Sequence, residues 1–75
     1  MSIQEFLEEL QGILQREEAL SGDEELKDLE EWDSIAIMTC VVWFESRLGI
    51  RQPYQFFQAQ KTVRDLIRAG EGKIA

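Results

Sequence analysis

Apolar residues recur at helical spacing along the first part of the chain, with Glu and Gln residues on the opposite side. Ser2 and Glu5 stand at the start of this segment with the spacing of a capping box. The pattern therefore predicts a first amphipathic helix over residues 3–16. Its inner face comprises Ile3, Phe6, Leu7, Leu10, Ile13 and Leu14.

Residues 17–33 follow no sustained period and contain the turn-forming run Ser21-Gly22-Asp23. They predict a long surface loop between the first and second helices. Spaced apolar residues indicate that this loop is ordered, and the capping-box spacing of Ser21 and Glu24 indicates one short turn of helix. The expected inward anchors are Leu20, Leu26, Leu29 and Trp32.

A second long helix is predicted from Ser34 to Leu48, with Asp33 as its N-cap and Gly49 as the residue that follows its end. A turn through Pro53 then leads to a short helix near residues 54–59.

The last helix is predicted to begin after Thr62, which has capping-box spacing with Asp65, and to end at Gly70. Its inner face comprises Val63, Leu66 and Ile67.

No segment alternates between apolar and polar residues as a strand would. The chain is therefore expected to be all-α, a small bundle of three main helices plus a short third helix. Its 75 residues give room for a single domain. We expect residues 3–69 to form the core and residues 70–75 to be a flexible tail.

The second helix carries two apolar stripes rather than one. The first has the spacing of a core face and comprises Ile37, Cys40, Val41, Phe44 and Leu48. The second comprises Ile35, Met38 and Val42, while Trp43 projects on the far flank. For Ile35 and Trp43, burial against a neighbouring helix and exposure are both open. Met38 and Val42 are predicted to be exposed and, with Ile35 and Glu45, to form a docking surface for a partner.

Charge and composition exclude several classes of function. The net charge is −7, and acidic residues are concentrated before Ser34, where they disfavour nucleic acid and favour a partner with a basic surface. The chain has no histidine, so the commonest general base is missing and catalysis of its own is not expected. The one cysteine, Cys40, lies on the core stripe, where we expect a buried small hydrophobe. No spacing of acidic residues matches a metal site.

The first residues lack the charge and the apolar run of a signal peptide, and nowhere do about 18 uncharged apolar residues follow one another. We therefore expect a cytoplasmic protein that does not insert into membranes. We also expect a monomer.

The pair Asp33-Ser34 fits two interpretations. Both residue types are ordinary at helix starts, so the pair can be a simple cap. A serine hydroxyl in the first turn also points to solvent beside free backbone N–H groups, where a phosphate ester would be stabilised. Local sequence alone leaves both readings open.

The order of elements resembles the acyl and peptidyl carrier protein family from about residue 3 to residue 69. The matching motifs are D-S-[LI] at Asp33-Ser34-Ile35, E-x-x-[FL]-G-I over residues 45–50 and T-V-x-D-L over residues 62–66. The resemblance implies a four-helix bundle in which a separate transferase moves 4'-phosphopantetheine from coenzyme A to Ser34. The thiol of that arm would hold an acyl or aminoacyl group as a thioester.

The resemblance also implies that loading and synthase enzymes recognise the second helix, at positions that here are Met38, Val42 and Glu45. Carriers of fatty acid synthesis usually bear several acids on this helix, whereas this chain has only Glu45. We therefore interpret it as a stand-alone acyl carrier of a specialised pathway, such as one for a polyketide, an unusual fatty acid or an envelope lipid. The alternatives are an aminoacyl or peptidyl carrier and an unmodified helical interaction module.

Overall fold

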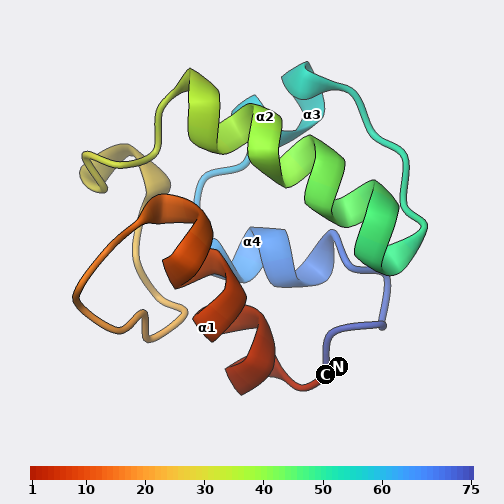
Figure 1. The fold of residues 1–75 in the computed structure, drawn as a ribbon, viewed down its shortest axis with the longest axis horizontal. Helices are drawn as coiled ribbons and strands as arrows, with labels where there is room; N and C mark the ends of the chain where they lie inside the picture. Colours follow the sequence, from red (N-terminus) through yellow and green to blue (C-terminus); the bar gives the residue numbers. More distant parts are fainter.

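The computed structural model describes residues 1–75, and its regular elements are all helical. The chain forms α1 (Ile3–Leu14), α2 (Ser34–Trp43), α3 (Tyr54–Gln58) and α4 (Val63–Arg68). A short 3₁₀ turn (Leu26–Asp28) lies in the loop before α2, and a π-helical segment (Phe44–Leu48) continues α2. Figure 1 shows α2 passing across one side of the molecule, with the two chain ends close together. The predicted all-α fold is confirmed.

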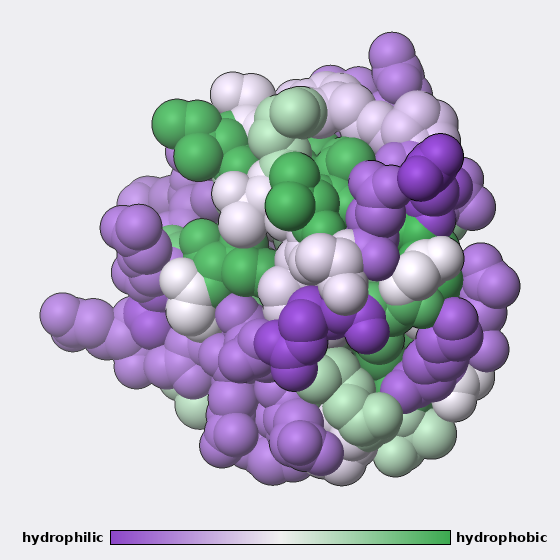
Figure 2. All heavy atoms as spheres, turned by 45° about the vertical axis from the view of Figure 1, so that its right-hand side comes forward, coloured by the Kyte–Doolittle hydropathy of each residue, from purple (hydrophilic) through white to green (hydrophobic).

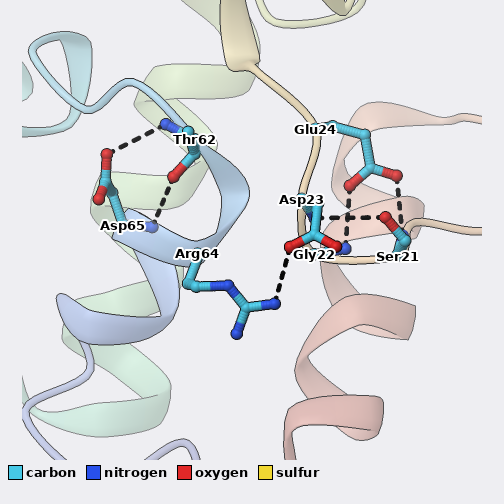
Figure 3. Close-up of polar contacts among 7 residues, drawn as sticks. All are labelled: Ser21, Gly22, Asp23, Glu24, Thr62, Arg64 and Asp65. Atoms are coloured by element: carbon cyan, nitrogen blue, oxygen red, sulfur yellow. Dashed lines mark hydrogen bonds and ion pairs between the residues drawn. The ribbon is translucent and has the colours of Figure 1, made fainter.

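Side-chain caps define three of the helix starts. Ser2 Oγ accepts a hydrogen bond from the Glu5 N–H at 3.0 Å, and the Glu5 carboxylate accepts one from the Ser2 N–H. Thr62 and Asp65 make the same reciprocal pair at 3.1 Å, drawn in Figure 3. Asp33 caps α2. These three starts agree with the predictions because a cap depends on residues a few positions apart.

The helix ends agree less closely with the predictions. α1 ends at Leu14 rather than residue 16, because Gln15 adopts a left-handed conformation with φ 54°. Gly49 ends the second helix as predicted, with φ 70°, but the last turn before it is π-helical. α4 ends at Arg68, before the predicted Gly70.

The core is a single cluster built around Phe44. Its ring lies 6.1 Å from the Phe6 ring of α1 and 4.8 Å from the Phe57 ring of α3, measured between centroids. Such edge-to-face and tilted aromatic contacts add to the free energy gained by burial. The predicted loop anchors Leu20, Leu26 and Leu29 are buried, and Trp32 packs half-buried against the same cluster.

The loop before α2 is attached to the start of α4. Its backbone pairs with the α3–α4 connection through hydrogen bonds of 2.8 Å from the Leu26 N–H to the Lys61 oxygen and 3.0 Å from the Val63 N–H to the Glu24 oxygen. Arg64 adds an ion pair to Asp23 at 2.9 Å (Figure 3). These contacts keep the loop ordered, as predicted.

The prediction of a helical turn after Ser21 is wrong. The Glu24 carboxylate instead accepts the N–H groups of Ser21 and Gly22, at 2.8 and 2.9 Å, and closes a non-helical turn (Figure 3). The one helical turn of the loop begins at Leu26.

Residues 70–75, the predicted flexible tail, include residues that pack onto the bundle. Ile74 is only 4% exposed and lies against Gly70, where a Cβ atom would stand 2.8 Å from the Ile74 Cδ1. The Ala75 N–H donates to the Met1 oxygen at 2.9 Å, and the amino group of Met1 donates to the Lys73 oxygen at 2.8 Å. None of the helices combines the length and apolarity needed to cross a membrane.

Because Ile74 is buried, we expect the tail to contribute to the free energy of unfolding. We expect Ile74→Ala to lower the free energy of unfolding by about 2 kcal/mol, because it leaves a cavity against Gly70. Ile35→Ala is the matched control: Ile35 is 74% exposed, and its loss should cost less than about 0.5 kcal/mol. Urea unfolding measures the free energy of unfolding of both variants. A loss for Ile74→Ala as small as that for Ile35→Ala would show that Ile74 does not stabilise the fold.

Candidate functional site

Asp33 positions the N-terminal end of α2. Its Oδ1 accepts the Ala36 N–H at 2.9 Å, and its backbone oxygen accepts the Ile37 N–H at 3.0 Å. The chain reaches Asp33 through a turn in which the Trp32 N–H donates to the oxygen of the buried Leu29 at 3.0 Å. The first residue of α2 therefore has a fixed place relative to the core.

Ser34 is that first residue, and it is exposed. Its hydroxyl makes no hydrogen bond, and the N–H groups of Ser34 and Ile35 have no acceptor within the protein. Free N–H groups and the positive end of the helix dipole favour a negatively charged group at this place. The hydroxyl is thus accessible and lies where a phosphate ester would be stabilised.

The groove that begins at Ser34 has no basic residue in its lining. Arg16, which follows the C-terminal end of α1, is paired with Glu31 at 3.0 Å. The Asp33 carboxylate is engaged in the cap. Stabilisation of an anion on Ser34 would therefore come from the backbone of α2.

The second apolar stripe of α2 is exposed, as predicted for Met38 and Val42. Ile35, Met38 and Val42 are 74%, 51% and 61% exposed. With Ser34 and Thr39 they line a shallow groove of about 450 Å³. Figure 2 shows hydrophobic side chains reaching the molecular surface in patches between polar ones. The open question about Ile35 is thereby settled in favour of exposure.

Trp43 belongs to the α1–α2 interface instead. Its ring lies 5.5 Å from the Phe6 ring, and its Nε1–H donates to Glu9 at 3.1 Å. Arg47 lies over the same ring and pairs with Glu9 at 2.6 Å. The hydrogen bond from Trp43, followed by the one from Arg47, lowers the pKa of the Glu9 carboxyl. Trp43 therefore holds two helices together and is not part of the exposed stripe of Ile35, Met38 and Val42.

Glu45 does not line the groove with the three apolar residues. Its carboxylate pairs with Arg51 at 2.8 Å, and both side chains are exposed. The single acid of the second helix is therefore partly neutralised within the protein. Exposed pairs of this kind are weak, so a partner could still compete for Glu45.

Neither a reactive thiol nor a cluster of metal ligands is found in the structure. Cys40 is buried, and this burial raises the pKa of its thiol to about 12, so it is not a nucleophile at neutral pH. No group of three or more His, Cys, Asp or Glu residues is arranged to hold a metal ion.

The structure also contains a hollow that the sequence did not reveal. It has a volume of about 480 Å³ and lies between the loop before α2 and the α3–α4 connection. Trp32, Lys27 and Lys61 are among the residues that line it. No local pattern could have indicated it, because its two sides are more than 25 positions apart in the sequence.

Comparison with known families gives one match. The family described as "phosphopantetheine attachment site" matches residues 4–69, which is nearly the whole chain and includes all of the groove. Comparisons with curated proteins and with solved structures gave no match.

The structure separates the roles of Asp33 and Ser34, and stability measurements can test this. Asp33→Ala removes the cap and should lower the free energy of unfolding by about 1 kcal/mol. Ser34→Ala removes an exposed hydroxyl without a partner and should change it by less than about 0.5 kcal/mol. Thermal or urea unfolding of both variants gives the comparison, and a loss at Ser34→Ala as large as at Asp33→Ala would make Ser34 part of the cap.

Proposed function

The chain belongs to the phosphopantetheine attachment site family, and on this premise we propose that it is an acyl carrier protein modified at Ser34. Domains of this family are the site of covalent 4'-phosphopantetheine attachment and are generally non-catalytic carriers. The observation that supports Ser34 as the attachment residue is its exposed, unpartnered hydroxyl at the capped start of α2, inside the matched region.

The residues around Ser34 fit such a group. Ser34 is exposed and lines an open groove, so its hydroxyl is accessible to a transferase. After attachment, the free N–H groups of Ser34 and Ile35 can hold the negative charge of the phosphodiester. Asp33 keeps these groups in place by capping the same turn at 2.9 Å. The arm, once attached, supplies a thiol that holds the acyl group as a thioester.

The docking surface of this carrier would be mainly apolar. Ile35, Met38 and Val42 are exposed side by side along the groove that begins at Ser34. Glu45 extends this surface, although it is already paired with Arg51. We propose that transferase, loading and synthase enzymes contact these residues. The acidic loop before Ser34 would attract them over longer distances.

The balance of apolar and charged groups on the second helix bears on which partner enzymes, and so which pathway, the carrier would serve. A helix with one partly neutralised acid offers little to an enzyme that selects carriers by negative charge along that helix. A dedicated set of partners with apolar docking sites fits it better. We therefore propose a specialised pathway, with an aminoacyl or peptidyl carrier as the alternative.

An unmodified interaction module is the second candidate, and the exposed groove is the observation that favours it. The groove is present without the arm, so it could bind a protein even if Ser34 were never modified. The two proposals differ in what Ser34→Ala does: the carrier loses its function, whereas the interaction module keeps its binding.

Modification of Ser34 is tested directly by mass. After incubation with a broad-specificity phosphopantetheinyl transferase, magnesium and coenzyme A, we expect the intact protein to gain one phosphopantetheine. Ser34→Ala should gain nothing. Ser46→Ala, which removes another exposed serine of the second helix, should be modified like the wild type. No gain on folded wild-type protein with several transferases would refute the carrier function.

The docking surface is tested by the rate of the same reaction. A charge in the middle of the groove must lose water when a partner binds, so Met38→Glu should lower kcat/KM of the transferase about tenfold, equivalent to about 1.4 kcal/mol. Gln55→Glu adds the same charge at an exposed position of α3 and should have little effect. Circular dichroism of both variants verifies folding. Equal rates would remove Met38 from the docking surface.

A further inference from the structure

The hollow beside the loop before α2 is a built feature of the fold. The two segments that form it are joined by backbone hydrogen bonds, from the Leu26 N–H to the Lys61 oxygen at 2.8 Å and from the Val63 N–H to the Glu24 oxygen at 3.0 Å. Figure 1 shows the α3–α4 connection passing behind the N-terminal half of α2. The hollow has a volume of about 480 Å³, which is in the range of small-molecule sites.

Two lysines from distant parts of the chain line this hollow. Residues 17–33 contain nine acidic residues and one basic residue, Lys27, and that residue lines the hollow. Lys61 lines it from the other side and has no ion-pair partner. Glu25 is the only acid in the lining, and its 4.0 Å separation from the Lys27 ammonium makes their pair a loose one. The hollow therefore carries net positive charge in the most acidic part of the molecule.

Other residues of the lining suit an acyl chain. The half-buried Trp32 supplies apolar surface, and Gln58 supplies an amide that can donate hydrogen bonds. No part of the hollow is lined by Phe44 or Phe57, so it is separate from the aromatic centre of the core. Apolar surface from Trp32, together with two lysines in the same lining, matches a short chain that ends in a carboxylate.

We propose that this hollow holds the anionic end of a carboxylated acyl cargo carried on Ser34. The inference rests on the proposed function, because the arm must bring the cargo. Trp32 is two residues before Ser34, so one residue of the lining has its Cα atom at most about 7 Å from the Cα atom of Ser34. Exposed lysines bind a free carboxylate weakly, but a tethered one is present at high local concentration.

Three cargoes of equal chain length test the charge preference. Transferase and the corresponding coenzyme A thioesters would load glutaryl, pentanoyl or 5-aminopentanoyl groups onto ¹⁵N-labelled protein, and intact mass would verify loading. In ¹H–¹⁵N spectra we expect the glutaryl cargo alone to shift the amides of Lys27 and Lys61 and the indole of Trp32. These shifts should largely disappear in about 1 M NaCl, where the Debye length is about 3 Å.

Charge-matched variants complete the experiment. Lys61→Gln should reduce the glutaryl-specific shifts, and the double variant Lys27→Gln with Lys61→Gln should abolish them. Arg51→Gln removes one positive charge outside the hollow and should leave the shifts intact. Equal shifts with all three cargoes, or larger shifts with 5-aminopentanoyl, would overturn the inference and leave the carrier function standing. Failure to load any cargo on Ser34 would overturn both.

Discussion

Burial of Phe44 is the interaction on which the arrangement of the site depends. Its ring joins α1 and α3 through Phe6 and Phe57, and it lies where α2 passes into its π-helical end. With this end fixed in the core, the rotation of α2 about its axis is determined. Ile37 and Cys40 then face inward, and Ile35 and Met38 face solvent. The exposed stripe is thus a consequence of how one aromatic residue packs.

The features that the sequence predicted correctly depend on neighbours within a few positions. Capping boxes, the Asp33 cap and the inner faces of the helices are of this kind, and so is the exposure of Met38 and Val42, which follows from helical spacing once the core face is known. Attachment at Ser34, the cytoplasmic location and the monomeric state stay predictions.

The features that the sequence did not predict depend on contacts between distant segments. Ile74 is buried because α4 ends early enough for the tail to turn back onto Gly70. Ser21 and Glu24 have the spacing of a cap, but the backbone of this loop pairs with the α3–α4 connection instead of forming a helix there. The hollow with Lys27 and Lys61 arises from the same pairing. Local patterns carry no information about which distant segment supplies the partner.

The pairing of the chain ends has a mechanical consequence. Met1 is hydrogen-bonded to both Lys73 and Ala75, so the two ends leave the bundle at one place, away from the N-terminal end of α2 in Figure 1. A protein anchored to a bead or a resin through either end would therefore turn the same side toward its support. Ser34 would face the surrounding solution whichever end is attached. A short peptide could also join the two ends into a circle without crossing the groove.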